Sequence, residues 1–318
     1  MPALHGISSV ALARELLRRL QLQSLDAGRQ QKVLGRLAAE LGVRTQRGAN
    51  RFSVARSLVQ ARKLLRHPDF TVPDLAGAVC VDLGCGTFNP LGGVFALILL
   101  GAARGIGIDT DPVTSVEPSV RALYDCAASF ATGVVEPSAL LVPAGLLQRR
   151  LAGFDLAKLA RGDVDGVDAT RLEFRIADAK TTQLEDASID VVTSKSFLEH
   201  IDDPDAVLAE LARITRPGGL AFHAIDGFDH RHWGNHEVHP LEFLREPPGP
   251  PIVHGCNRLR PLEFSARFER HGFDVRGVVE GQHVEITPEL RASLAEPYRD
   301  LPTEVLAAGA ADFYLRRR

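Results

Sequence analysis

The sequence predicts an α/β protein with an open, doubly wound and mostly parallel sheet. Residues 79–87 (Val-Cys-Val-Asp-Leu-Gly-Cys-Gly-Thr) join small and branched apolar residues, typical of a buried strand, to a glycine-rich turn. The apolar segment 91–100 can then form a helix, and residues 104–111 give a second short strand that ends in acids. A strand, a glycine turn and a helix present a nucleotide at the carboxyl ends of such strands.

The glycine turn does not fit the common phosphate-binding patterns. The dinucleotide pattern G-x-G-x-x-G needs a third glycine where Asn89 stands, and the P-loop needs a lysine that is absent near the turn. Asp82 precedes the turn instead. A carboxylate there repels a pyrophosphate and suits a cationic ligand. Gly84 and Gly86 would let the backbone approach that ligand, because glycine has no side chain and tolerates positive φ.

Residues 79–87 resemble the first motif of class I S-adenosylmethionine-dependent methyltransferases. The later elements follow the order of that family: an acid at Asp109, the third strand at 174–179, the fourth strand and the start of the next helix at 188–201, and a helix end and turn at 211–220. The resemblance implies a Rossmann-like seven-stranded methyltransferase sheet, mostly parallel with an antiparallel last strand. The remaining expected elements are a helix over 264–271 and strands near 272–279 and 311–315.

The same resemblance implies the contacts to S-adenosylmethionine. Gly84 and Gly86 would admit the amino-acid part of the cofactor, and Asp82 would neutralise or orient it. Asp109 would hold the ribose, since a carboxylate accepts two hydrogen bonds. NAD enzymes use an acid in the same way, and Asp is also common as a helix N-cap. The other implied contacts are Cys85, Asp178 at the adenine amino group, Ala179, and Ser194 and Phe197 beside the methyl group.

Histidines gather after the expected fifth strand. Five of the eleven histidines lie between His223 and His239. Methyl transfer from a sulfonium is an in-line displacement, so the protein mainly aligns the nucleophile and removes its proton. Asp226, His230 and His232 are the candidates for this work. Two alternatives stay open: a transition-metal site, although the spacing matches no signature and no metal ligand is assigned, and a surface loop without chemistry.

Other polar residues near this segment have two interpretations each. Asn257, Arg258 and Arg260 could grip a carboxylate or phosphate of the acceptor, since Arg suits bidentate recognition. They could equally tie a helix N-terminus to the sheet. His200, in a Glu-His pair that recurs in the resembled family, is expected to line the cofactor pocket.

The predicted organisation is a helical N-terminal extension over 1–70 and a methyltransferase domain over 71–318, with a helical insertion at about 113–171. Apolar spacing predicts helices near 8–22, 27–41 and 54–66 in the extension, and near 120–132 and 137–160 in the insertion. Such an extension could cover the cofactor, shape the substrate site, or serve packing or a homodimer contact.

Composition excludes several classes. Residues 1–70 carry 13 Lys/Arg and 4 Asp/Glu in a chain of net charge −3, but no nucleic-acid motif accompanies them, so we expect no nucleic-acid partner. No apolar run reaches the roughly 18 residues of a membrane span, and no leader pattern opens the chain. The four cysteines form no C-x-x-C pair, which disfavours a zinc knuckle or a disulfide framework. These features predict a cytoplasmic protein.

The expected activity is methyl transfer from S-adenosylmethionine to a small-molecule acceptor, at a hydroxyl of a sugar or natural product. Residues 223–230, 239–244 and 257–264 resemble a bacterial branch often associated with polysaccharide or secondary-metabolite genes. Residues 194–197 lack the Asn/Asp-Pro-Pro-Tyr/Phe pattern of amide and base N-methylators, so protein and RNA acceptors are disfavoured. The alternatives are N- or C-methylation of a natural-product precursor, and a non-catalytic cofactor-binding partner subunit.

Overall fold

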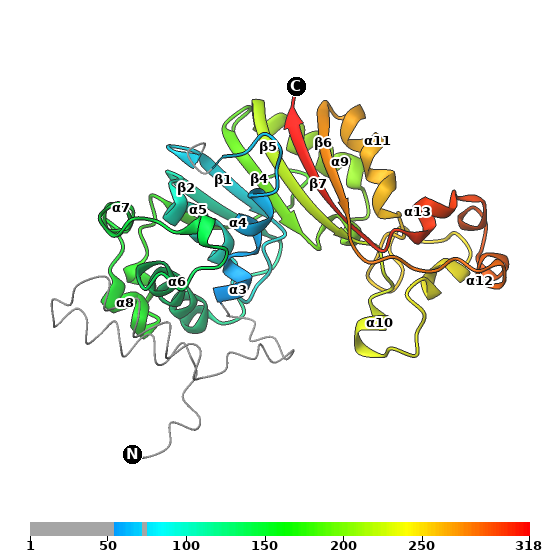
Figure 1. Ribbon diagram of the computed structural model, residues 1–318, viewed down its shortest axis with the longest axis horizontal. Helices are drawn as coiled ribbons and strands as arrows, with labels where there is room; N and C mark the ends of the chain where they lie inside the picture. Colours follow the sequence, from blue (N-terminus) through cyan, green and yellow to red (C-terminus); the bar gives the residue numbers. More distant parts are fainter. Residues whose placement is uncertain (1–53, 72–74) are drawn as a thin grey trace, which may run out of the picture.

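The computed structural model describes residues 54–71 and 75–318, and one seven-stranded sheet forms its centre (Figure 1). The strand order is β3-β2-β1-β4-β5-β7-β6. Strands β1 to β5 are parallel, and β7 is antiparallel to both neighbours, β5 and β6. The expected Rossmann-like sheet with an antiparallel last strand is confirmed. The strands are β1 Val79–Leu83, β2 Arg104–Asp109, β3 Leu172–Ile176, β4 Ile189–Lys195, β5 Thr215–Asp226, β6 Phe273–Glu280 and β7 Ala310–Arg317.

Helices cover both faces of the sheet, each over its own apolar core. One face carries α3 Val54–Ser57, α4 Val59–Leu64, α5 Gly92–Leu100, α6 Val116–Ala131, α7 Ala144–Arg150 and α8 Leu156–Arg161. The other face carries α9 Pro204–Ile214 and α11 Phe264–Arg270. All nine residues of α5 are buried. This explains why the segment reads as uniformly apolar rather than amphipathic: it lies between the sheet and the outer helices.

A small lobe of short helices lies beyond the ends of β5 and β6 (Figure 1). Its helices are α10 Arg231–Gly234, α12 Pro288–Ser293 and α13 Thr303–Ala307, with 3-10 turns at Glu242–Arg245 and Tyr298–Asp300. They share a third apolar cluster, made of Leu241, Phe243, Leu244, Cys256, Leu290, Leu294 and Leu306. The lobe therefore has enough apolar contact to hold residues 227–257 beside the carboxyl end of β5.

Several expected elements differ in detail. The helix near 54–66 is divided into α3 and α4 and ends before Pro68, while those near 8–22 and 27–41 lie outside the described residues. The helix near 137–160 is replaced by α7, α8 and a 3-10 turn at Ser138–Leu140, because Pro143 and Gly153 (φ 94°) interrupt it. The strand expected near 174–179 ends earlier, at Ile176.

The turn expected before the fifth strand lies inside it. Helix α9 ends at Ile214, Thr215 already pairs with Ile189 of β4, and residues 216–219 form an irregularity in β5 before pairing resumes at Leu220. Gly218 takes φ 77° at this irregularity, as the glycine of a turn does. Within the described residues, none of the helices has both the length and the apolar character needed to cross a membrane.

Candidate functional site

The sheet order places the carboxyl ends of β1 and β4 side by side. The chain leaves β1 toward β2 and β3, then returns to the other side of β1 with β4. The connections after these two strands therefore diverge. A crevice forms at such a switch point, and it is where open α/β sheets bind their ligands.

The glycine turn after β1 has the backbone geometry that the sequence predicts. Gly84 and Gly86 adopt φ 63° and 78°, which side chains rarely tolerate. A Cβ atom on Gly84 would overlap the ring of Phe197, whereas one on Gly86 would meet nothing. The Gly86 amide donates a 2.8 Å hydrogen bond to Oδ2 of Asp109, so the end of β2 fixes the turn.

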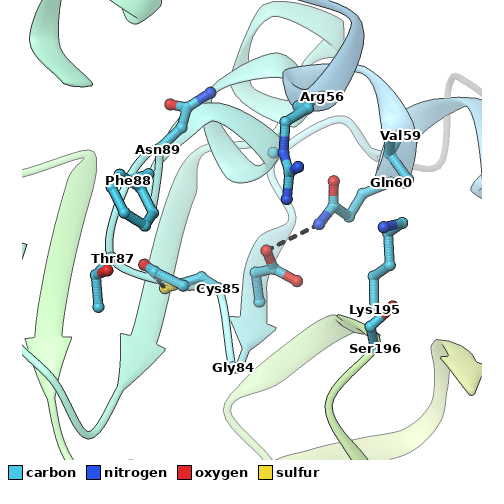
Figure 2. Close-up of a pocket in the computed structure, with 13 residues that line it drawn as sticks. Arg56, Val59, Gln60, Gly84, Cys85, Thr87, Phe88, Asn89, Lys195 and Ser196 are labelled. Carbon is cyan, nitrogen blue, oxygen red and sulfur yellow. Dashed lines mark hydrogen bonds between the residues drawn. The ribbon is translucent and has the colours of Figure 1, made fainter. Parts of the chain in front are cut away.

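A cavity of about 550 Å³ opens at this turn (Figure 2). Its lining comes from β1 and the turn after it, from the start of α5, from the end of β4 and from the helices α3 and α4: Arg56, Val59, Gln60, Asp82, Gly84, Cys85, Gly86, Thr87, Phe88, Asn89, Gly93, Lys195 and Ser196. The contribution of α3 and α4 could not be assigned from the sequence, because a lone Gln and Arg in a basic, leucine-rich segment carry no motif.

The floor of the cavity is acidic. Asp82 is 3 % exposed, and its carboxylate accepts hydrogen bonds from Gln60 Nε2 at 2.9 Å and from the Thr193 hydroxyl at 2.8 Å. Burial raises the pKa of Asp82 to about 7. Oε1 of Gln60 is buried without a hydrogen-bond partner among the described residues. A cationic donor placed here would satisfy Gln60 and favour the ionised form of Asp82.

Two cationic side chains also line the cavity. Arg56 and Lys195 point into the same space as Gln60 (Figure 2). Neither makes an ion pair with another described residue. Loss of water and the nearby Arg56 guanidinium lower the pKa of Lys195. Ser196 follows with φ 48°, an uncommon conformation for a residue other than glycine and one that clusters at functional sites.

The acids after β2 and β3 lie at neighbouring strand ends. Asp109 ends β2, and its other oxygen, Oδ1, accepts the Asp111 amide at 3.2 Å. Asp178 follows β3 in a loop, is exposed, and accepts the Lys180 amide at 2.8 Å. Ala179 is buried in the second core cluster. These residues line up in the order that the resemblance implies, although none of the three lines the cavity.

Of the other implied cofactor contacts, only Cys85 lines the cavity. Burial beside Asp82 and Asp109 raises the pKa of the Cys85 thiol. Phe197 packs on Gly84 from the second core cluster. Ser194 is fully buried, and its hydroxyl lies 2.8 Å from Nδ1 of His223. Ser194 therefore lies on the core side of β4, and we leave it out of the proposed contacts.

Asp226 and His230 come together at the end of β5. Oδ2 of Asp226 lies 3.9 Å from Nε2 of His230 and accepts the Trp233 indole N–H at 3.2 Å. Nε2 of His230 is buried without a hydrogen-bond partner among the described residues. Loss of water and the neighbouring His200 lower the pKa of His230. The imidazole is therefore neutral near pH 7 and can take up a proton or a ligand.

His232, the third candidate, has a different environment. Its Nδ1 lies 2.7 Å from the Val238 carbonyl oxygen, and its ring meets that of His236 at 5.1 Å between centroids. These contacts hold the loop after β5 rather than joining the Asp226–His230 pair. His223 is excluded from proton transfer, because burial lowers its pKa to about 3 and Ser194 occupies Nδ1.

Two further residues at this end were not among the sequence candidates. Glu199 is 2 % exposed and accepts the Asp226 amide at 3.3 Å, and burial raises its pKa to about 8. Cys256 is also 2 % exposed and lies close to His200 and His230. Glu199 belongs to the Glu-His pair at 199–200, whereas Cys256 stands in no recognisable pattern, since the fold alone brings the loop near 256 to the end of β4.

The polar group at 257–260 is structural. Asn257 Nδ2 donates to the carbonyl oxygens of Leu198 and Ile201 at 2.7 and 3.0 Å. Arg260 is fully buried and donates to the carbonyl oxygens of Gly227, Leu306 and Ala308. Arg258 donates to those of Glu246 and Pro247. The second interpretation of this group, a local tie to the sheet, fits these contacts.

Residues 129–223 match the protein-family model described as a methyltransferase domain. This segment runs from the end of α6 into β5 and includes β3 and β4. This match and the seven-stranded sheet support a class I S-adenosylmethionine-dependent methyltransferase domain. The match begins after the glycine turn. The turn, Asp82 and Asp109 are therefore independent of the match, and they point to the same family. S-adenosylmethionine is the cofactor of this methyltransferase.

A curated protein matches a short part of the chain. A stretch of 87 residues is 34% identical to an uncharacterized 37.1 kDa protein in transposon Tn4556 of Streptomyces fradiae. It covers 21% of this chain and 25% of that protein, so this chain spans about a quarter of that relative's length.

Solved methyltransferase structures are similar at low identity. A chain from the complex of the Haloferax volcanii Trm112 methyltransferase activator with a methyltransferase is 18% identical, with a TM-score of 0.44 over 83% of this chain and 90% of that chain. Geranyl diphosphate C-methyltransferase from Streptomyces coelicolor is 16% identical, with a TM-score of 0.44 over 81% and 77%. Similarity at this level says nothing about the acceptor or a partner.

Proposed function

We propose that this methyltransferase transfers a methyl group to a hydroxyl oxygen of a small molecule, such as a sugar or natural product, in secondary metabolism. The observation that carries the proposal is the paired charge of the cavity. Asp82 and the Gln60 oxygen that lacks a partner among the described residues share this cavity with Arg56 and Lys195. The amino-acid end of S-adenosylmethionine carries one ammonium and one carboxylate, and such a cavity complements both.

The remaining cofactor contacts follow from the strand ends. Gly84, Cys85 and Gly86 would lie against the amino-acid part, where a side chain on Gly86 would point into open space. Asp109 accepts two backbone amides and keeps lone pairs for ribose hydroxyls, because a carboxylate offers about four acceptor sites. Asp178 and Ala179 would meet the adenine, one strand further along the sheet.

We assign the methyl transfer to the acceptor hydroxyl to the end of β5. Bound S-adenosylmethionine supplies a methyl group activated on a sulfonium. Asp226 and His230 would orient the acceptor hydroxyl and take its proton. The hydroxyl oxygen bonds to the methyl carbon as the carbon–sulfur bond breaks, and the electron pair stays on the sulfur. His232, which is engaged with Val238, would hold this loop in place.

The N-terminal extension would act as a cap on the cofactor. Arg56, Val59 and Gln60 line the cavity from the last part of the 1–70 segment, above the turn that belongs to the 71–318 domain. This arrangement favours a role in cofactor binding over a purely structural one. The cytoplasmic location and the homodimer stay predictions.

The test is methyl transfer itself. The protein is incubated with methyl-labelled S-adenosylmethionine and a panel of hydroxyl, amine and carbon acceptors matched in size. We expect label in an O-methyl group and loss of at least about a hundredfold in turnover for His230→Ala. Label on nitrogen or carbon, with little effect of His230→Ala, would support the N- or C-methylation alternative. Cofactor binding without transfer to any acceptor would support the partner-subunit alternative.

A further inference from the structure

Three metal-binding side chains meet beside the ends of β4 and β5. His200, His230 and Cys256 each offer a ligand atom, and the three atoms lie within 4.8 Å of one another. They come from a 3-10 turn at Leu198–His200, from the loop after β5 and from the loop before Asn257. Their separation in the sequence explains why the spacing of the residues predicts no metal signature.

The two histidines present free nitrogens. Nδ1 of His200 lies 2.7 Å from the Gly255 carbonyl oxygen, and that contact requires the proton on Nδ1. Nε2 of His200 is then an unprotonated acceptor. A carbonyl partner of this kind is the usual way in which proteins fix the tautomer and orientation of a metal-binding histidine. Nε2 of His230 is buried without a hydrogen-bond partner among the residues that the structure describes. A buried polar atom without a partner costs free energy, and a bound metal ion would remove that cost.

The three segments are tied together before any ligand arrives. The Asn257 amide donates to the Glu199 carbonyl oxygen at 2.7 Å, which joins the Cys256 loop to the His200 turn. Val253 and Cys256 pair through backbone hydrogen bonds of 2.8 and 3.0 Å. The Cys256 thiol also contacts the Phe228 carbonyl oxygen, near His230. Such preorganisation reduces the ordering cost of binding.

We propose that His200, His230 and Cys256 bind one Zn²⁺ ion. Two imidazoles and a thiolate suit zinc, whereas magnesium prefers oxygen. Tetrahedral zinc holds such ligands about 3.3–3.8 Å apart, so binding requires the three side chains to draw together by about 1 Å. Three protein ligands leave the fourth position open, as in catalytic zinc sites.

The open coordination position gives the zinc ion a role in the proposed methyl transfer, and this role rests on that proposed function. His200 is exposed, so the site borders solvent, and Oδ2 of Asp226 lies 3.9 Å from Nε2 of His230. An acceptor hydroxyl bound to the ion would lose its proton more easily, since zinc lowers the pKa of a bound hydroxyl group. Asp226 would then take the proton, and His230 would serve as a zinc ligand rather than as the base.

Cobalt and zinc titrations test the site. Metal-free protein is titrated with Co²⁺, followed by Zn²⁺, under reducing conditions. We expect one equivalent of Co²⁺, a thiolate-to-cobalt charge-transfer absorption in the near ultraviolet, and its loss on addition of Zn²⁺. Cys256→Ser removes this absorption, whereas Cys126→Ser, at another fully buried cysteine, keeps it.

An exposed ligand provides a variant that does not depend on core packing. His200→Ala should weaken zinc affinity at least about a hundredfold, since loss of even an outer partner typically costs about 10–100-fold. His283→Ala, at an exposed histidine whose side chain is paired with Glu280, should leave it unchanged. Folded wild-type protein without the cobalt absorption, or His200→Ala with wild-type zinc affinity, overturns the proposal.

S-adenosylhomocysteine binding in the same samples separates the two proposals. Binding of this ligand by a protein that takes no zinc contradicts the metal site alone. Zinc binding by a protein that does not bind S-adenosylhomocysteine contradicts the proposed methyl transfer alone.

Discussion

The Gln60 side-chain amide donates a 2.9 Å hydrogen bond to the Asp82 carboxylate and joins helix α4 to the end of β1. The bond leaves Oε1 of Gln60 buried and without a hydrogen-bond partner in the part of the chain that the structure describes, and Gln60 is only 8 % exposed. A buried amide that is half satisfied costs free energy until a donor reaches it. A ligand whose cationic group reaches this pair would therefore gain binding free energy from it.

Replacement of Gln60 tests this relationship. Gln60→Leu should weaken S-adenosylhomocysteine binding by about 10–100-fold, because hydrogen bonds to charged groups contribute about 1.5–3 kcal/mol. Isothermal titration calorimetry measures the change. Gln148→Leu, on the exposed side of α7, is the matched control and should bind as the wild type does. Equal affinities for the two variants would remove Gln60 from the cofactor site.

Cofactor affinity should depend on pH through Asp82. Burial raises its pKa to about 7, so the carboxyl is largely protonated below pH 7. A cationic ligand group favours the ionised carboxylate, and binding then releases a proton. The dissociation constant of S-adenosylhomocysteine should fall as pH rises toward 7 and level off above it. Asp82→Asn should flatten this profile, and an unchanged profile in that variant would contradict the assignment.

The same carboxyl predicts the pH dependence of folding without cofactor. The folded-state pKa is raised above the ordinary value of 3.8, so the folded protein binds more protons than the unfolded chain between about pH 4 and 7. The contribution of Asp82 to stability therefore falls as pH rises through this range. Urea unfolding of wild type and Asp82→Asn at several pH values measures the difference. Parallel stability profiles would show that Asp82 is not buried as described.

Gly84 should tolerate no side chain. In Gly84→Ala, the new Cβ overlaps the Phe197 ring and the residue must keep φ 63°, which together should cost about 1–3 kcal/mol of unfolding free energy. Urea unfolding measures the loss. Adding Phe197→Ala should reduce the overlap cost but keep the backbone strain. Gly145→Ala in α7, where a Cβ has room, should be neutral or stabilising.

Asp226 and His230 should affect turnover rather than cofactor affinity. We expect His230→Ala and Asp226→Asn each to lower methyl transfer by about a hundredfold or more, while S-adenosylhomocysteine binding stays within about twofold of wild type. Label transfer and calorimetry on the same samples measure both quantities. His283→Ala controls for the loss of an exposed histidine. A parallel loss of cofactor affinity would place the pair in the cofactor site instead.

Local patterns predicted the centre of the fold. Asp82, the glycine turn and Asp109 lie in one continuous strand–turn–helix–strand segment. Their spacing in the sequence was therefore enough to predict that they lie close together at the ends of neighbouring strands. Ser194 was expected beside the methyl group, but its side chain is buried, and its hydroxyl lies 2.8 Å from Nδ1 of His223. The roles of Gln60 and Cys256 could not be predicted, since only the packing of distant segments brings them to the site.

The most direct test of the account is calorimetric binding of S-adenosylhomocysteine, with NAD as the comparison ligand and Asp109→Ala as the comparison protein. The account predicts saturable one-to-one binding of S-adenosylhomocysteine, no binding of NAD, and at least about tenfold weaker binding in the folded Asp109→Ala variant. Binding of NAD, or wild-type affinity for S-adenosylhomocysteine in Asp109→Ala, would contradict the assignment of the cavity and its strand-end acids to this cofactor.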